Sequence, residues 1–289
     1  MTAPAAPRTA AVVGGGTMGA GIAHVLLAAG SLVTVVEAGA ERVVAAWEAV
    51  ATSLRKAEER GKLPAGAEDL LARLSVVDGP AGLPSEASLV VEAVPEDLAL
   101  KRRILADVAQ RCPEAVLASN TSSLSITALA EHLPGERVVG MHFFNPVPVQ
   151  ALVELVTHDG LRADTLAAVR GYAEALGKTV IEVRDSPGFA TSRLGVAVGL
   201  EAIRMLAEGV ASAEDIDTGM RLGYGWPMGP LRLTDLVGLD VRLSIAEHLE
   251  RELGPRFAPP ELLRNKVARG ELGRKTGRGF FDWSTKGAL

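Results

Sequence analysis

Short runs of β-branched residues alternate along the first part of the chain with longer Ala- and Leu-rich segments whose apolar positions recur at helical spacing. This alternation is typical of βαβ units around a parallel sheet. Helices are expected over residues 17–29, about 40–60, 96–111 and 164–176. Strands are expected at TAAVV (9–13), LVTVVE (32–37), RLSVV (73–77), LVVEAV (89–94), AVLAS (115–119), VVGMHFF (138–144), ALVELV (151–156) and TVIEV (179–183).

The pattern changes after Arg184. DSPGF is a turn, and from Ala190 onward the apolar residues follow a helical period with almost no strand-like alternation. Three segments there end at Gly or Pro: EAIRMLAEG, SAEDIDTGMRLG and LRLTDLVGLDVRLSIAEHL. The expected fold class is therefore α/β followed by all-α, with a Rossmann-like domain and mostly parallel sheet over 1–184 and a helical domain over 185–289.

Composition excludes several classes of protein. The 289 residues suffice for two domains, and 48% apolar with 22% charged residues is ordinary for a soluble globular chain. The formal net charge is -5, with Lys and Arg spread along the chain, which argues against nucleic-acid binding. The single Cys112 rules out an internal disulfide or thiolate metal cluster, so no metal is expected. MTAPAAPRTA lacks an apolar signal region and no apolar run reaches membrane-spanning length, so a cytoplasmic location is expected.

A glycine motif lies between the first predicted strand and the first predicted helix. In AAVVGGGTMGAG, Gly14 permits a tight turn, Gly16 lets the backbone approach a pyrophosphate, and Gly19 lets the helix pack close to the sheet. The helix N-terminus would face the phosphates. Glu37 ends the second strand, eighteen residues after Gly19, as this dinucleotide-binding pattern requires.

Glu37 also predicts which dinucleotide binds. A carboxylate accepts hydrogen bonds from the ribose hydroxyls but repels a 2′-phosphate. The residues that follow it, AGA, include no Arg that would bind such a phosphate. The predicted cofactor is therefore NAD and not NADP.

Three further segments lie at or beyond strand ends, where open α/β sheets place their ligands: SNTSSLSI (119–126), HFFNPVP (142–148) and ALVEL (151–155). Of the five histidines, only His142 closes a strand and leads into an Asn-Pro turn. An imidazole titrates near neutrality and suits a general base for an alcohol proton. Glu154, in an apolar strand, would orient that ring, and Ser122 offers a hydroxyl to the substrate oxygen. A purely structural ion pair between His142 and Glu154 is the alternative.

The chain resembles 3-hydroxyacyl-CoA dehydrogenases, including the 3-hydroxybutyryl-CoA type, over nearly its whole length. The motifs are VVGGGTMGAGIA, VVEAVPEDLALK, ASNTSSLSI, GMHFFNPVPV, LVEL, DSPGF, GYGWPMGPLRLTDLVGLD and GRKTGRGFFDW. The resemblance implies NAD-dependent oxidation of an (S)-3-hydroxyacyl-CoA to the 3-ketoacyl-CoA by hydride transfer. It also implies that the helical domain serves substrate binding and forms a two-fold homodimer.

The resemblance also implies a set of site residues. The catalytic positions are His142 as general base, Glu154 as its partner and Ser122 as a contact to substrate and cofactor. Coenzyme A would be contacted by Ser53, Arg60 and Ser122. The cofactor-binding positions are Gly14, Gly16, Thr17, Met18, Gly19, Glu37, Glu96, Lys101, Ser122, Asn145 and Lys275.

Two positions depart from the family pattern. GFATSRL places Ser192 where the family usually has an Asn near the substrate carbonyl, and Ala151 replaces a Lys that often precedes LVE. Ser192 is kept as a candidate catalytic residue. The loss of one oriented donor would cost about 2–4 kcal/mol of transition-state stabilisation if nothing compensates.

Two other functions compete with the thioester dehydrogenase. One is oxidation of a free hydroxy acid or sugar acid, as in gulonate dehydrogenase relatives; HFFNP and the positive charge of Arg60 favour the thioester instead. The other is a non-catalytic NAD-binding protein of the same fold, against which the intact Ser122, His142 and Glu154 argue.

Overall fold

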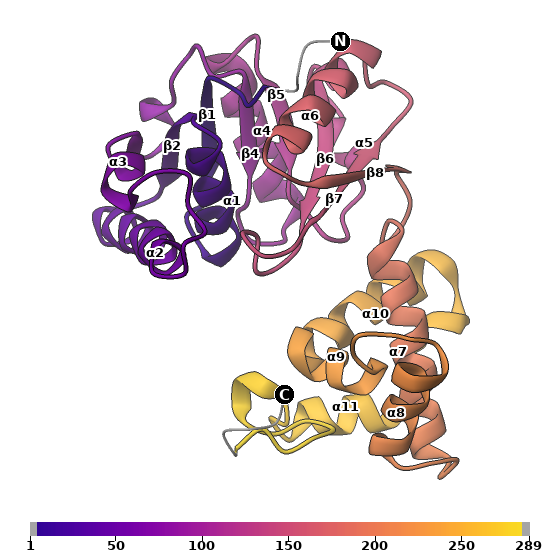
Figure 1. The fold of residues 1–289 in the computed structure, drawn as a ribbon. Helices are drawn as coiled ribbons and strands as arrows, with labels where there is room; N and C mark the ends of the chain where they lie inside the picture. The colour runs from indigo at the N-terminus through magenta and orange to yellow at the C-terminus, as the bar shows by residue number, and fades with distance from the viewer. Residues whose placement is uncertain (1–4, 285–289) are drawn as a thin grey trace. The chain divides into compact units, whose positions relative to one another are not determined.

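The structure is a computed structural model that describes residues 5–284, and it divides into two compact units, Met1–Asp185 and Ser186–Leu289 (Figure 1). The first unit contains an eight-stranded sheet with helices, and the second is helical. The α/β fold class with a helical C-terminal part is therefore confirmed. Within residues 5–284, no helix has both the length and the apolar character needed to cross a membrane.

The sheet has the strand order β3-β2-β1-β4-β5-β6-β7-β8. All neighbouring strands run parallel except β6 and β7, which are antiparallel. Each strand expected from the sequence is present, with ends that differ by at most two residues. The strands are β1 (Thr9–Val13), β2 (Leu32–Glu37), β3 (Leu74–Asp78), β4 (Leu89–Glu92), β5 (Val116–Ser119), β6 (Val138–Phe143), β7 (Leu152–Thr157) and β8 (Thr179–Arg184).

The helices between these strands are the expected ones with two short additions. The four longer helices are α1 (Thr17–Ala28), α2 (Ala40–Glu58), α4 (Leu98–Arg111) and α6 (Ala163–Ala175). The pattern missed α3 (Ala67–Leu71) and α5 (Ile126–Ala130), because five residues are too few to display a helical period.

The central strands are buried on both faces, which explains their nearly continuous apolar sequence. Every residue of β4, β5 and β6 is buried, and so are four of the five residues of β1. Each fully buried Val or Leu side chain contributes about 1.5–3 kcal/mol relative to exposure. The one carboxylate in β4, Glu92, is an exception in this core and requires a partner.

The second unit packs five helices around one apolar core: α7 (Thr191–Ala207), α8 (Ala213–Gly223), α9 (Pro230–Val237), α10 (Leu239–Leu253) and α11 (Glu261–Ala268). The sequence pattern treated LRLTDLVGLDVRLSIAEHL as one helical segment, which is wrong. Gly238 has a φ of 103°, a conformation that favours glycine, and it separates α9 from α10. The helical period continues across this break, so periodicity did not reveal it.

Candidate active site and cofactor site

The glycine turn joins β1 to α1 at very close range. Gly14 has a φ of 99°, and a Cβ there would lie 2.8 Å from the Ala93 carbonyl oxygen. A Cβ on Gly19 would lie 1.7 Å from the Gly14 carbonyl oxygen, so α1 begins against the turn itself. A Cβ on Gly16, by contrast, would meet no atom within 4 Å. Two glycines are therefore required for packing, and the third borders open space beside the N-terminus of α1.

This open space is part of a cavity of about 660 Å³ lined within the first unit by the glycine turn, Thr17, Met18, Glu37 and one side of α4. Glu37 accepts hydrogen bonds from Gly15 N at 2.6 Å (Oε1) and Ala38 N at 3.1 Å (Oε2). Each carboxylate oxygen retains a second lone pair for a ribose hydroxyl. The cavity therefore fits a dinucleotide.

Arg42 lines the same cavity, although the sequence argument found no Arg directly beside Glu37. The fifth residue after Glu37 is the one that matters, because α2 starts at Ala40 and its first turn brings Arg42 back toward the strand end. Both a carboxylate, Glu37, and a cation, Arg42, therefore line this cavity.

His142 and Glu154 lie directly opposite each other on the antiparallel strands β6 and β7. His142 Nδ1 is 2.7 Å from Glu154 Oε2, and the two residues are 6% and 0% exposed. An ionised carboxylate only accepts hydrogen bonds, so Nδ1 donates, and the neutral ring carries its proton-accepting lone pair on Nε2. Glu154 therefore fixes the orientation of the His142 ring at the end of β6.

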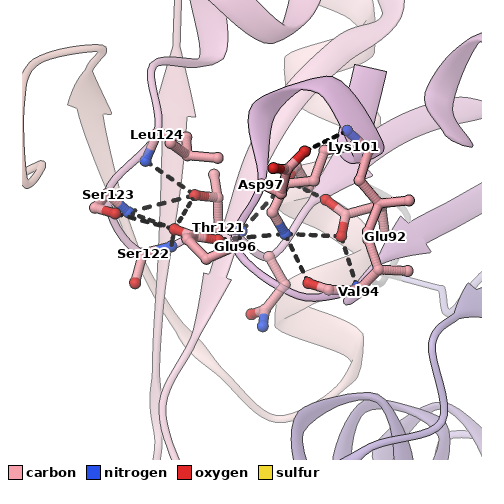
Figure 2. Close-up of polar contacts among 12 residues, drawn as sticks. Glu92, Val94, Glu96, Asp97, Lys101, Thr121, Ser122, Ser123 and Leu124 are labelled. Carbon is pink, nitrogen blue, oxygen red and sulfur yellow. Dashed lines mark hydrogen bonds and ion pairs between the residues drawn. The ribbon is translucent and has the colours of Figure 1, made fainter. Parts of the chain in front are cut away.

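The segment that follows β5 carries Ser122, and Glu96 holds it in place (Figure 2). Glu96 Oε1 accepts hydrogen bonds from Thr121 Oγ1 at 2.6 Å, Ser122 N at 3.1 Å and Ser123 Oγ at 3.0 Å. Burial raises the pKa of Glu96, but the Lys101 ammonium and the hydrogen bonds from this segment outweigh it and hold that pKa below its usual range. Glu96 is therefore a charged anchor for the Ser122 loop.

Lys101 is buried and its ammonium is fully engaged (Figure 2). Its Nζ lies 2.8 Å from Glu92 Oε1, 3.0 Å from the Val94 carbonyl oxygen and 3.3 Å from Glu96 Oε2. Three contacts match the three protons of an ammonium. Lys101, to which the resemblance assigns a role in cofactor binding, thus contacts two carboxylates and the backbone of the β4–α4 loop.

Glu92 was missed by the sequence argument. Its Oε2 accepts a hydrogen bond from Ser119 Oγ at 2.6 Å, and its Oε1 accepts one from Val94 N at 2.7 Å. This single carboxylate joins the ends of β4 and β5 to the loop before α4. The sequence did contain a signal for Glu92, because it is an acid at the end of the apolar run LVVE and a carboxylate is costly to bury without a partner.

The end of β5 is also linked to the end of β6. Asn120 Oδ1 accepts a hydrogen bond from Phe143 N, one residue beyond His142, at 2.9 Å. Asn145, two residues further on, is exposed in the turn after β6. The strand ends that carry Ser122, His142 and Asn145 therefore belong to one edge of the sheet, as their positions after parallel strands predicted.

The positions implied for coenzyme A lie on and after α2. Ser53 Oγ is 2.8 Å from His24 Nδ1 of α1, and Arg60 is exposed just beyond the helix end. Lys56, also exposed, is three residues from Ser53 and four from Arg60, so these side chains lie on one helical face. Lys56 was not singled out from the sequence.

The buried His24 is expected to make the free energy of unfolding depend on pH. His24 is 4% exposed, and burial, followed by the Lys178 ammonium, lowers its pKa from 6.5 to about 4. Because the unfolded chain binds this proton more readily, the contribution of His24 is complete above pH 6.5 and is lost as the pH falls toward 4, by up to about 3 kcal/mol. Free energies of unfolding in urea at pH 7, 5 and 4 would measure it. His24→Gln does not titrate; a loss as large as in the wild type would contradict the prediction.

Two site residues that the resemblance implies, Ser192 and Lys275, belong to the second unit. Ser192 is half-buried in the first turn of α7. Lys275 forms an ion pair of 2.6 Å with Asp240 of α10. Lys275 is thus tied to the start of α10.

The doubly wound sheet, the glycine turn with Glu37 and the His142–Glu154 pair at the strand ends define an NAD-dependent dehydrogenase. The chain belongs to the 3-hydroxyacyl-CoA dehydrogenase family. The family model for the 3-hydroxyacyl-CoA dehydrogenase NAD binding domain matches residues 9–186. The family model for the 3-hydroxyacyl-CoA dehydrogenase C-terminal domain matches residues 188–283.

Individual relatives match nearly the whole chain. The chain is 44% identical over 280 residues to the 3-hydroxybutyryl-CoA dehydrogenase of Mycobacterium tuberculosis, covering 94% of this chain and 97% of the relative. It is 40% identical over 281 residues to the 3-hydroxyadipyl-CoA dehydrogenase of Escherichia coli, covering 96% of this chain and 59% of the relative. The crystal structure of (S)-3-hydroxybutyryl-CoA dehydrogenase from Ralstonia eutropha superposes with a TM-score of 0.91 at 42% identity, covering 97% and 100% of the two chains.

Proposed function

We propose that this protein oxidises the 3-hydroxyl of (S)-3-hydroxyacyl-CoA thioesters to the ketone with NAD, and that His142 is the general base. The buried pair of His142 and Glu154 at the end of β6, 2.7 Å apart, carries this proposal. Membership of the family supports the reaction class. The net change is loss of a hydride from C3 and of a proton from the hydroxyl oxygen.

The chain's own residues handle the proton. His142 accepts the hydroxyl proton at Nε2, and the Glu154 carboxylate stabilises the imidazolium that forms. The Ser122 hydroxyl orients the substrate oxygen, and Glu96 fixes the backbone on which Ser122 sits. NAD, when bound, supplies the acceptor for the hydride.

The cofactor is held by the residues around the cavity of the first unit. Gly16 admits the pyrophosphate, Gly14 and Gly19 allow α1 to begin against the turn, and Glu37 binds the ribose. Asn145 and Lys275 keep the cofactor roles that the resemblance implies. Lys101 acts differently, through Glu92 and Glu96, because its ammonium is already engaged by both.

Cofactor choice gives a prediction at Glu37. Replacing Glu37 with Ala removes the carboxylate that repels a 2′-phosphate and leaves Arg42 in the same cavity to attract one. We expect the NADH-to-NADPH ratio of kcat/KM to fall by about tenfold to a hundredfold, the value of one charge-assisted hydrogen bond. Glu41→Ala, on the exposed first turn of α2, is the matched control. An unchanged ratio in Glu37→Ala would contradict the ribose contact.

The thioester itself is tested by comparing acetoacetyl-CoA with free acetoacetate in an NADH-absorbance assay. If Ser53 and Arg60 recognise coenzyme A, the protein turns over the thioester and not the free acid. Comparable turnover of the free acid would favour the hydroxy-acid alternative, and NAD binding without any turnover would favour the non-catalytic one. The homodimer and the cytoplasmic location stay predictions, which light scattering and cell fractionation would test.

A further inference from the structure

The Ser122 loop, which joins β5 to α5, is held at its second end by Asp185. Asp185 Oδ2 accepts a hydrogen bond from Ser125 Oγ at 2.7 Å and another from Thr127 N at 2.8 Å. Ser125 Oγ in turn accepts a hydrogen bond from Ala128 N at 3.1 Å, so its hydroxyl both caps α5 and donates to the carboxylate. One carboxylate oxygen therefore holds the first turn of α5, directly after the loop.

Asp185 comes from a distant part of the chain. It follows β8 directly, and its backbone N donates a hydrogen bond to the Thr157 carbonyl oxygen at 2.7 Å, so the sheet fixes its backbone. In the sheet, β6 and β7 lie between β5 and β8, and β8 runs antiparallel to β5. The next residue, Ser186, begins the second unit. The Ser122 loop is thus tied to a fixed point of the sheet, at the residue where the chain leaves the first unit.

Glu96 and Asp185 hold the two ends of one short segment. Glu96 Oε1 accepts hydrogen bonds from Ser122 N at 3.1 Å and Ser123 N at 3.2 Å (Figure 2). Asp185 holds Ser125, and the three residues from Ser122 to Ser125 span at most about 11 Å of extended chain. Ser122 is half-buried, and its hydroxyl has no hydrogen-bond partner among the residues that the structure describes. The position of this hydroxyl is therefore set by the backbone that Glu96 and Asp185 hold.

The other oxygen of the Asp185 carboxylate argues against a purely stabilising role. Oδ1 is buried and accepts no hydrogen bond within the described part of the chain. A buried acceptor without a donor costs stability, and this cost offsets part of what the two bonds to Oδ2 contribute. The helix α5 is also held by packing, because Ile126 and Leu129 are fully buried. The carboxylate is therefore a poor source of stability, and its clear effect is on the position of the segment.

We propose that Asp185 is a positioning residue for the oxidation: it fixes the end of the Ser122 loop so that the Ser122 hydroxyl is held at the substrate oxygen. This inference rests on the proposed function, in which Ser122 orients that oxygen, and it names a residue on which the orientation depends. In this role Asp185 needs no contact with substrate or cofactor. Its loss leaves His142 as the base and changes how well the substrate oxygen is aligned with it.

The kinetic test uses NADH absorbance with acetoacetyl-CoA. Asp185→Ala removes the acceptor of both hydrogen bonds, and we expect kcat/KM to fall by about ten- to a hundredfold, chiefly through kcat, because a misplacement of about 1 Å can cost about a hundredfold. Asp185→Asn keeps an oxygen that accepts both bonds, so it should stay within about threefold of the wild type. Asp159→Ala is the matched control, because Asp159 pairs with the neighbouring Arg184, is 89% exposed and should leave kcat/KM unchanged. Equal losses in Asp185→Ala and Asp185→Asn would contradict the inference.

A double-mutant cycle shows whether Asp185 acts through Ser122. Ser122→Ala removes the hydroxyl, and we expect it alone to lower kcat/KM by about tenfold or more. Nothing is then left for Asp185 to position, so adding Asp185→Ala should lower kcat/KM by no more than about a further twofold. Losses that multiply would mean that Asp185 acts independently of Ser122, and the inference would be wrong.

Hydrogen exchange measures the loop without turnover. Thr127 N donates to Asp185, so exchange in a peptide that spans residues 120–130 should become about tenfold faster in Asp185→Ala, and it should not change in Asp159→Ala. The Tm of Asp185→Ala should stay within about 4 °C of the wild type, because removing the unsatisfied oxygen offsets part of the loss. Unchanged exchange over 120–130, or faster exchange throughout the first unit together with a large fall in Tm, would overturn the inference.

Failure of this inference is distinguishable from failure of the proposed function. If the wild type consumes no NADH with acetoacetyl-CoA, or if Ser122→Ala is as active as the wild type, the role given to Ser122 is wrong and the inference falls with it. If the wild type and Ser122→Ala behave as expected and Asp185→Ala keeps full activity, only the inference is wrong.

Discussion

Replacing His142 with Ala is expected to lower kcat by about a hundredfold to ten-thousandfold, the usual contribution of a general base. The ring is the proton acceptor, and Glu154, 2.7 Å from Nδ1, both orients it and stabilises its cation. Water in the space that the ring vacates is a much weaker base. NADH absorbance with acetoacetyl-CoA measures the loss, and a fluorescence titration with NADH should give nearly unchanged cofactor affinity.

The matched control for this prediction is His132, whose side chain is 87% exposed. His132 has a φ of 65°, a conformation that asparagine tolerates, so His132→Asn leaves the backbone unstrained and should retain full activity. If His142→Ala is folded and turns over within about threefold of the wild type, His142 is not the base. The pair with Glu154 would then be the purely structural alternative.

The sheet and the ends of its strands were predictable because each strand is specified by residues that are adjacent in the sequence. A strand buried on both faces needs a nearly uninterrupted apolar run, and LVVE and VVGMHF are such runs and are buried at every residue. The glycine turn was predictable for a related reason. Gly14 and Gly19 are required by contacts too close for any Cβ, so their spacing reflects geometry that other residues do not permit.

The remaining features depend on contacts between elements that are distant in sequence. Glu92 and Ser119 come from two strands, and only the parallel register of β4 and β5 brings them together. Arg42 enters the cofactor cavity because of where α2 begins. No periodicity in a single segment encodes these relations.

Glu92→Ala is expected to lower the free energy of unfolding by about 3–5 kcal/mol, the usual effect of breaking a buried ion pair. The substitution leaves the Lys101 ammonium buried with one carboxylate fewer, and it also removes the acceptor of Ser119 Oγ and Val94 N. Urea denaturation of the wild type and the variant measures the difference. The loop that holds Ser122 depends on the same lysine through Glu96, so the KM for NAD should rise as well.

A double-mutant cycle distinguishes a paired charge from a merely well-packed side chain. Lys101→Met removes the cation, so the Glu92→Ala, Lys101→Met protein should be more stable than Glu92→Ala alone, because the buried ammonium that lacks a carboxylate partner is gone. Glu68→Ala is the matched control: it breaks the exposed Arg55–Glu68 pair and should cost no more than about 1 kcal/mol. Additive losses in the cycle would mean that Glu92 and Lys101 stabilise the fold independently. The inference that Lys101 acts through these carboxylates, instead of contacting the cofactor, would then be wrong.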